Sequence, residues 1–444
     1  MKRKLILPCF SLFFASFFVP LQTKIKQTMS IMFSLRHGSL FFRHLAIVLA
    51  LMLLPCPSAA QKGKGLNVRQ DLSQARSYLR SRSKNYGQAE QLMNKLLKDS
   101  ACRENKHVHQ VLLEAVKGQY DQANERMYLK QKQDTAAFFT LARRMFTIAF
   151  TLDSLDMRPD KKGRVSPEYR QKYAQMLHAY RPNLFNGGTF FVRKGKWKEA
   201  FDFMDTYLDC GRQPLFQTYD YGTTDPRMAE AAYWATYSAY KQQDAKRTLQ
   251  HAQQALADTA HTDFALQFTA EAHRWLDNKG SYVATLEEGF RHSPQFPYFF
   301  PRLMDAYMGS GDYTKALQLA DSALLVCDTC ELFLFAKSSV LLHQERWEES
   351  VRYSRLAMAQ NDSLPEPYFN AALAYVNMAD MPGVSDDKKK YTDYYQRART
   401  YMEYYRLLMP KEEEKWAPVL YRIYLNLNLG KQFDEIDKIL RKNK

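Results

Sequence analysis

The stretch of residues 300–325 constrains the fold more than any other, because it predicts two short amphipathic helices around a glycine hinge. Apolar residues recur at helical spacing in its first half and form one stripe. Gly309 and Gly311 then break the helix, since glycine reaches turn conformations at little steric cost. Small residues in the second half recur at steps of four and three, and together the two halves predict a helical hairpin. The stripe consists of Phe300, Leu303, Met304 and Tyr307, and the small residues are Ala316, Ala320 and Ala323.

The same hairpin pattern recurs at nearly constant spacing after residue 231. Upstream, Tyr86 and Tyr120 occupy equivalent positions 34 residues apart. One hairpin cannot bury its apolar face alone, so consecutive hairpins are expected to stack into a solenoid. The first helices of the regular hairpins are expected to begin near Ala231, Phe264, Pro297, Glu331 and Glu366, at intervals of 33, 33, 34 and 35 residues.

This pattern resembles the tetratricopeptide (TPR) repeat, whose Gly-x-Tyr-x-x-Ala core is present here as Gly311, Tyr313 and Ala316. The resemblance extends over residues 231–375 and recurs at 86–130 and 184–208. It implies an all-α fold, a right-handed α–α superhelix of roughly eight helix pairs, preceded by an N-terminal signal segment. In TPR proteins the concave groove of the superhelix holds an extended peptide or a partner helix.

The chain is expected to divide into four parts: a leader at residues 1–60, a linker at 61–70, an irregular TPR-like helical array at 71–215, and a regular TPR array at 227–444. In the irregular array, residues 166–168 (Ser-Pro-Glu) are expected to open a helix, with a cap followed by proline. Gly187 and Gly188 lie inside a first helix and permit tight packing. Residues 210–226 form a long polar and aromatic loop, which is either functional or an insertion.

The leader carries two apolar runs, residues 5–21 and 45–54. The second follows basic residues and ends in small residues, which predicts a secretory signal cleaved after Ala60. Its ten-residue core is shorter than the roughly 20 residues of a membrane span. Translation would then begin at Met29 or Met32. The chain is therefore expected to be exported to the periplasm or cell envelope, as in exported bacterial TPR proteins.

Two other interpretations of the leader remain open. Residues 5–21 could stay as a membrane anchor, or Cys56 could carry a lipid, although Pro55 stands where a small residue belongs in a lipobox. Either one would give a membrane association through the N-terminal segment. The protein would then be a membrane-tethered part of a sensor, a secretion system or an outer-membrane assembly complex.

Charge does not indicate nucleic-acid binding. The formal net charge is +16, but residues 1–60 contribute seven Lys and Arg and no acidic residue. The remaining chain has 56 basic against 47 acidic residues, a moderate excess. No helix-turn-helix, zinc-finger or RNP pattern accompanies it, so no nucleic-acid partner is expected.

No catalytic, cofactor or metal site is predicted, and the chain is not expected to be an enzyme. HExxH, GxSxG, P-loop and GxGxxG patterns do not occur. His107 and His109 are two residues apart and do not share a helix face. In an oxidising compartment Cys327 and Cys330 could form a small disulfide or stay as two free thiols, whereas thiol redox catalysis would need a βαβ unit.

The predicted function is a non-enzymatic scaffold of the cell envelope that binds a partner protein or peptide in the groove. Candidate groove residues are Arg302, Tyr307, Asn370 and Tyr375. The TPR resemblance places Asn370 at a position that, in some peptide-binding members, hydrogen-bonds a ligand backbone or carboxylate, but the matching Lys and Arg set is not evident. A second alternative is a SusD-like glycan-binding protein, although such proteins carry large non-helical insertions that this chain lacks.

Overall fold

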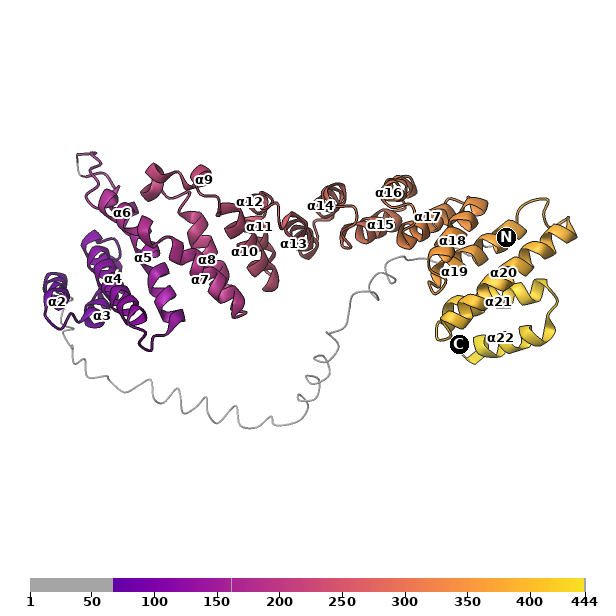
Figure 1. The fold of residues 1–444 in the computed structure, drawn as a ribbon, viewed down its shortest axis with the longest axis horizontal. Coiled ribbons are helices and arrows are strands. Elements are labelled where there is room, and N and C mark those ends of the chain that lie inside the picture. The colour runs from indigo at the N-terminus through magenta and orange to yellow at the C-terminus, as the bar shows by residue number, and fades with distance from the viewer. Residues whose placement is uncertain (1–66, 161, 443–444) are drawn as a thin grey trace, which may run out of the picture. The chain divides into compact units, whose positions relative to one another are not determined.

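The computed structural model describes residues 67–442 except residue 161, and every regular element in them is a helix (Figure 1). The described chain divides into two compact units between Phe268 and Thr269, inside helix α13 (Thr262–Trp275). We call residues 67–268 the N-terminal unit and residues 269–442 the C-terminal unit. The sequence predicts a boundary between an irregular and a regular helical array at residues 215–227. These residues lie within the N-terminal unit, and the predicted boundary stays a prediction.

The N-terminal unit consists of helix pairs in which each helix packs mainly against its neighbours along the chain. Two short elements, η5 and α9, lie in the connection that precedes the last pair, and that last pair has a divided second helix. The elements are α2 (Val68–Arg80), α3 (Tyr86–Leu97), η4 (Ser100–Cys102), α4 (Lys106–Tyr128), α5 (Thr135–Asp156), α6 (Arg170–Tyr180), α7 (Pro182–Arg193), α8 (Trp197–Asp209), η5 (Pro214–Tyr219), α9 (Tyr221–Thr224), α10 (Met228–Lys241), α11 (Ala245–Gln250) and α12 (Ala252–Ala255).

The C-terminal unit repeats the same plan with fewer interruptions. Its elements after α13 are α14 (Lys279–His292), α15 (Phe299–Ser310), α16 (Tyr313–Val326), α17 (Glu331–His343), α18 (Trp347–Gln360), α19 (Glu366–Ala379), α20 (Lys388–Leu408), α21 (Glu413–Asn426) and α22 (Gly430–Lys442). Counting α13 with α14, the described residues form nine consecutive helix pairs, close to the roughly eight expected. The predicted all-α fold of stacked helix pairs is confirmed.

Local sequence explains where many of these helices begin. A side-chain oxygen just before the helix accepts a hydrogen bond from an early backbone N–H, which satisfies a donor that the helix itself leaves unpaired. The residues that cap a helix in this way are Asn67, Asn85, Asn105, Asp134, Asp244, Asn278, Asp312 and Asp387. Several of these caps lie at the turn between the two helices of a pair, among them Asn278, Asp312 and Asp387. The turn residues therefore also determine where the second helix begins.

Close helix packing in the N-terminal unit requires glycine at the positions that the sequence singled out. A Cβ atom on Gly187 would lie 2.5 Å from Cε1 of Phe203, and one on Gly188 would lie 2.6 Å from Cε of Met204. Both distances are too short for any other residue unless the Phe203 ring or the Met204 side chain shifts. Gly187 and Gly188 therefore permit the close approach of α7 and α8, as the sequence predicted.

Two helix boundaries differ from the expectation, and in both cases a carboxylate from another helix explains the difference. Residues 166–168 do not open a helix, because α6 begins at Arg170. The Asp156 carboxylate at the end of α5 accepts the backbone N–H groups of Glu168 and Tyr169, both at 2.7 Å, and so holds these two residues in place before the helix begins. The hairpin pattern predicts one unbroken second helix over residues 245–257, but the structure divides it at His251, whose buried ring contacts Asp205 Oδ1 at 2.7 Å.

Residues 1–66 lie outside the described residues, and so do the predicted signal, its cleavage site, the alternative anchor and Cys56. Within residues 67–442, no helix combines the length and the apolar character that a membrane span needs.

Candidate functional site

A pocket of about 560 Å³ lies in the C-terminal unit where α18, α19 and α20 meet. Its floor is apolar, because the buried side chains of Val351, Tyr375 and Met378 line it. Its volume is within the usual range of ligand pockets, roughly 300–1,000 Å³. The rest of the lining consists of Glu348, Arg352, Arg355 and Leu356 from α18 and Asp393, Tyr394 and Arg397 from α20. We call this set the α18–α20 pocket.

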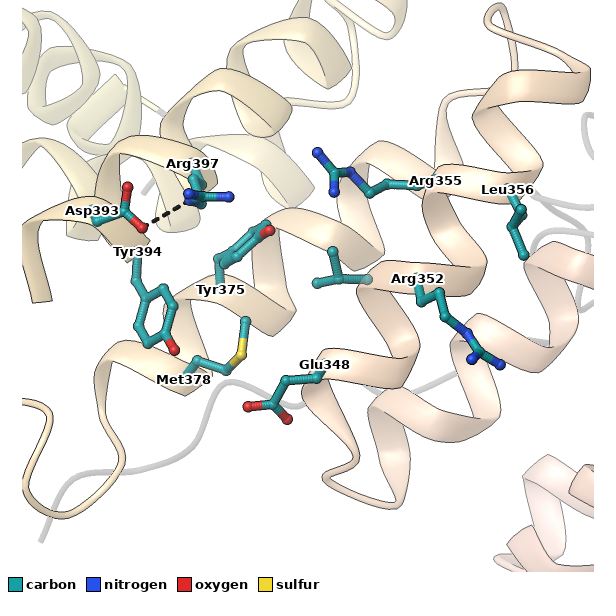
Figure 2. A pocket seen from close by; sticks show the side chains of 10 residues that line it. Glu348, Arg352, Arg355, Leu356, Tyr375, Met378, Asp393, Tyr394 and Arg397 are labelled. Carbon is teal, nitrogen blue, oxygen red and sulfur yellow. Dashed lines mark hydrogen bonds and ion pairs between the residues drawn. The ribbon is translucent and has the colours of Figure 1, made fainter. Parts of the chain in front are cut away.

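Arginine side chains reach the α18–α20 pocket from both flanking helices. Figure 2 shows Tyr375 between Arg355 of α18 and the Arg397–Asp393 pair of α20. Arg397 Nε donates to Asp393 Oδ2 at 2.8 Å, and its guanidinium carbon lies 5.9 Å from the Tyr375 ring centroid. Arg355 Nε donates to the Tyr401 hydroxyl at 3.2 Å. These contacts fix cations on two sides of an aromatic floor.

The third arginine of the pocket, Arg352, belongs to a cationic cluster where α17 packs against α18. Arg352 Nη2 and Lys337 Nζ both donate to the Tyr353 hydroxyl, at 2.9 and 2.8 Å. Burial alone would raise the pKa of Tyr353, but the two hydrogen bonds outweigh it and lower the pKa below its ordinary value. The lowered pKa indicates a positive potential beside the pocket, although Asp321 lies 2.6 Å from Lys337 Nζ and balances part of it.

The arrangement is suited to binding an acidic ligand segment. Three guanidinium groups face two carboxylates around the α18–α20 pocket, and a guanidinium can hold a carboxylate through two parallel hydrogen bonds. The apolar floor can accept an aliphatic or aromatic side chain. Among residues 67–442 apart from residue 161, no group of three His, Cys, Asp or Glu side chains is placed to hold a metal ion.

Of the predicted groove residues, Tyr375 lines the α18–α20 pocket, and Asn370 lies on the same helix but away from it. The buried Asn370 amide donates to the hydroxyls of Ser339 and Ser338, at 2.8 and 3.2 Å. Ser338 Oγ in turn lies 2.6 Å from Ser354 Oγ. Asn370 therefore joins α17, α18 and α19 through a buried hydroxyl network, and its role in binding stays a prediction.

Arg302 and Tyr307 lie on α15, and neither lines the α18–α20 pocket. The Arg302 guanidinium lies over the Tyr298 ring, 3.9 Å from its centroid, and 3.9 Å from the buried Glu271 carboxylate. The Tyr307 hydroxyl donates to Glu287 Oε1 on α14 at 2.5 Å. Both side chains make packing contacts within the C-terminal unit, and the structure does not gather the four predicted residues into one site.

Cys327 and Cys330 are half-buried free thiols in the structure. They flank the turn from α16 to α17, where Cys327 follows the last residue of α16 and Cys330 precedes the first residue of α17. The disulfide that an oxidising compartment would permit stays a prediction.

The long loop at residues 210–226 is ordered and packs into the N-terminal unit. The buried Arg181, between α6 and α7, places its guanidinium 3.7 Å from the Tyr207 ring centroid and 3.9 Å from that of Tyr221. The same guanidinium forms an ion pair with Asp225 at 2.5 Å, and Asp225 also accepts from the Tyr207 hydroxyl at 2.6 Å. One buried cation thus joins the end of α8 to the last part of the inserted segment.

The electrostatics of this ion pair follow from burial and hydrogen bonding. Burial would raise the pKa of Asp225, but hydrogen bonds from Tyr207, the Arg227 backbone and Arg181 outweigh it and hold the pKa below its ordinary value. Burial raises the pKa of the nearby Cys210 thiol to about 12, so this cysteine is not an activated nucleophile. The loop makes a packing contribution to the unit.

Sequence interpretation missed the arginines of the α18–α20 pocket. Arg352 and Arg355 are three residues apart and share one exposed face of α18, which an inspection of helical spacing could have found. Arg397 lies on the next second helix, 42 residues beyond Arg355, and only the packing of α18, α19 and α20 brings the two together.

This chain is similar to known proteins in its structure, but its sequence matches none of the families or curated proteins compared with it. The C-terminal part of a TPR repeat-containing protein from Cytophaga hutchinsonii is similar over 57% of this chain and 93% of that chain, with 9% identity and a TM-score of 0.40. Yeast Tom70 is similar over 84% of this chain and 91% of that chain, with 10% identity and a TM-score of 0.32.

A third similar structure is the TPR2AB domain of yeast Sti1 in complex with pHSP90. It matches 66% of this chain and 98% of that chain, with 14% identity and a TM-score of 0.24. The similar solved structures include TPR-repeat proteins, the family that the sequence resembles.

Proposed function

We propose that this protein is a non-enzymatic scaffold that binds a partner protein through an extended acidic segment held in the α18–α20 pocket. The observation that carries the proposal is the placement of Arg352, Arg355 and Arg397 around a floor made by Val351, Tyr375 and Met378. A segment with a carboxylate near an apolar side chain would satisfy both the cations and the floor. Stacked helix pairs support such a role, because they offer an extended surface that changes little on binding.

The pocket is better suited to holding a ligand than to transforming it. Its titratable groups are arginines, tyrosines and two carboxylates, and one carboxylate, Asp393, is already paired with Arg397. Arg355 and Arg352 donate to tyrosine hydroxyls on the protein itself, so their positions are set before a ligand arrives. Preorganised cations lower the cost of ordering side chains on binding.

Selection from a random peptide library would test the proposal without knowledge of the partner. The purified protein should enrich peptides that carry Asp or Glu next to an aromatic or aliphatic residue. The Arg355→Ala/Arg397→Ala variant should bind a selected peptide at least about tenfold more weakly, since each lost charged hydrogen bond is worth about 1.5–3 kcal/mol. Fluorescence polarisation of the labelled peptide gives the affinity.

The matched control is Arg441→Ala, which removes an exposed arginine that is paired with Asp437 on α22, outside the pocket. It should leave the affinity unchanged. Selection of peptides without acidic residues, or equal binding by the pocket variant and the control, would contradict the proposal.

We place this scaffold in the cell envelope, on the strength of the basic, apolar and small-residue pattern that ends at Ala60. Its partner would then be another exported or membrane protein. N-terminal sequencing of the mature protein tests the location: a chain that starts at Gln61 supports export with cleavage. A chain that starts at Cys56 or retains residues 5–21 supports the membrane-tethered alternative instead.

A further inference from the structure

The turns between the two helices of each pair are strongly basic in the N-terminal unit. We call these turns and their flanking residues the basic edge, defined as residues 80–85, 126–134, 193–199 and 241–247. They hold thirteen Lys and Arg against three acidic residues. The cations are Arg80, Arg82, Lys84, Arg126, Lys130, Lys132, Arg193, Lys194, Lys196, Lys198, Lys241, Lys246 and Arg247. All except the half-buried Arg247 are exposed.

Successive antiparallel pairs place all these turns along the same edge of the unit. In Figure 1 the turns that join α4 to α5 and α7 to α8 lie at its lower edge, and residues 157–160, residues 162–169 and α9 lie at its upper edge. The connections at the upper edge, residues 98–105, 157–169, 209–227 and 256–261 without residue 161, hold seven Lys and Arg against eight acidic residues. Only one edge of the unit is therefore basic.

The two edges also differ in how their charges are paired. At the opposite edge Arg158 pairs with Glu104, Arg164 with Asp160, and Arg212 with Asp209. On the basic edge only Arg247 forms an ion pair within the described residues, at 3.8 Å from both Asp202 and Asp244. The other twelve cations of the basic edge keep their charge available for an external anion.

An apolar tip projects from the basic edge at the end of α4. Tyr128 is 86% exposed and Leu129 56% exposed, with Met127 beside them at 38%. The tip has a fixed backbone, because Lys130 adopts a left-handed conformation with φ of 56° and the Gln131 N–H donates to the Arg126 carbonyl at 2.8 Å. Such a turn holds the apolar side chains outside the core, where they contact water.

We propose that the basic edge docks on an anionic lipid bilayer, with the Tyr128–Leu129 tip inserted among the headgroups. An anionic bilayer offers many negative charges in one plane, which fits a row of unpaired cations along one edge. It also offers an apolar layer just beneath the charges, which fits Leu129 and the amphipathic Tyr128. A nucleic acid would match the cations but offers no comparable environment for an exposed leucine beside methionine.

Vesicle sedimentation with the full chain tests the proposal. The protein should bind vesicles of phosphatidylcholine with roughly a third phosphatidylglycerol and should bind pure phosphatidylcholine vesicles much more weakly. Binding should fall steeply between about 0.1 and 1 M salt, because the Debye length shortens from about 10 to 3 Å. Binding that is equal on both vesicle types would overturn the proposal, and it would indicate insertion of residues 1–60 or an apolar contact alone.

A charge-reversal variant locates the contact. The change of Lys130, Lys132, Lys194 and Lys196 to Glu should lower the partition coefficient at least about 100-fold, since each surface cation contributes about fivefold. The control reverses Lys388, Lys389, Lys431 and Lys438, four exposed lysines of the C-terminal unit, and changes the net charge by the same amount. The control should bind like the unaltered chain, and an equal loss in both variants would overturn the proposal.

A second variant tests the apolar tip. Tyr128→Ser/Leu129→Ser should weaken vesicle binding about tenfold, whereas Leu325→Ser/Val326→Ser should not change it. Leu325 and Val326 are likewise exposed, at 90% and 46%, but they lie at the end of α16 in the C-terminal unit. Tighter binding to a short DNA duplex than to the anionic vesicles, with no effect of the tip variant, would overturn the proposal in favour of a nucleic-acid surface.

Discussion

The two units of this protein use the same helix pairs but distribute charge in opposite ways. Residues 67–268, without residue 161, hold 30 Lys and Arg against 22 acidic residues, whereas residues 269–442 hold 22 against 25. In the N-terminal unit the excess cations lie at the turns. The equivalent turns of the C-terminal unit, residues 275–279, 308–315, 343–349, 380–390 and 426–431, hold seven basic and eight acidic residues.

The two units also treat a half-buried carboxyl group differently. Asp225 in the N-terminal unit receives Arg181 and Tyr207 as partners, and its pKa lies below the ordinary value. Asp305 in the C-terminal unit has no hydrogen-bond partner at its buried Oδ1, and burial raises its pKa to about 7. A repeat architecture therefore fixes the packing of helices, but the local partners of each carboxyl group decide its charge.

The largest effect is expected from Arg181→Met, which leaves the half-buried Asp225 without its cation. Removal of one partner of a buried ion pair costs about 3–5 kcal/mol of the free energy of unfolding. Chemical denaturation measures the change, and Arg181→Met/Asp225→Asn should recover part of it, because no unpaired charge then remains. The exposed Arg212→Met should cost less than about 0.5 kcal/mol. Equal losses for Arg181→Met and Arg212→Met would show that the inserted loop is not held by this pair.

Close helix contacts should matter in both units, and matched glycine substitutions test this. A Cβ atom on Gly118 would lie 2.2 Å from the Tyr86 ring, and one on Gly289 would lie 2.3 Å from the Phe299 ring. Gly118→Ala and Gly289→Ala should each cost about 1–3 kcal/mol through overpacking. Gly87→Ala and Gly280→Ala meet no atom within 4 Å and should stabilise their helices by up to about 1 kcal/mol. A loss in only one unit would show that the two units pack differently.

The two carboxyl groups should give opposite pH dependences. The raised pKa of Asp305 keeps it protonated in the folded chain from about pH 4 to 7, where the unfolded chain ionises, so its contribution to stability falls as the pH rises. Asp305→Asn should therefore stabilise the chain by about 1–2 kcal/mol at pH 8, after allowance for solvent screening, and have little effect at pH 4. Thermal denaturation across this range measures the difference.

Asp225 provides the comparison for that pH experiment. The pKa of Asp225 is lower in the folded chain than in the unfolded chain, where it is about 3.9. The ionised carboxylate therefore stabilises the fold above about pH 3.9, and this stabilisation is lost as the pH falls through the folded pKa. Asp225→Asn should therefore destabilise the chain at pH 7 and matter less in acid. If the stability change caused by each variant had the same pH dependence, the contrast between the two units would be contradicted.

The smallest effect is expected in the hydroxyl network of the C-terminal unit. Ser338→Ala removes a partner of Ser354 and Asn370 and should cost about 1 kcal/mol, since it leaves buried polar groups with fewer hydrogen bonds. Ser322→Ala, whose exposed hydroxyl contacts only the Gln318 carbonyl, should change stability by less than about 0.5 kcal/mol. Urea denaturation of both variants makes the comparison.

Local patterns in the sequence were sufficient to predict the fold but not the candidate site. The hairpin of residues 300–325 appears in the structure as α15 and α16, because glycine, alanine and the Asp312 cap act within one or two helical turns. Tyr375 was predicted for the groove and lines the α18–α20 pocket, but its arginine neighbours were missed. The network at Asn370 and the orphan oxygen of Asp305 likewise depend on side chains from other helices.

The sequence by itself determined that this chain forms helix pairs, where most pairs turn, and which alanine and glycine positions permit close approach. These properties depend on helical spacing and on residues within a few positions of each other. Only the tertiary structure decided that Arg181 reaches Asp225, that Arg355 and Arg397 face one pocket, and that the cations of four separate turns line one edge. Each of these contacts joins residues distant in the chain, and the stacking of the helices sets their distance.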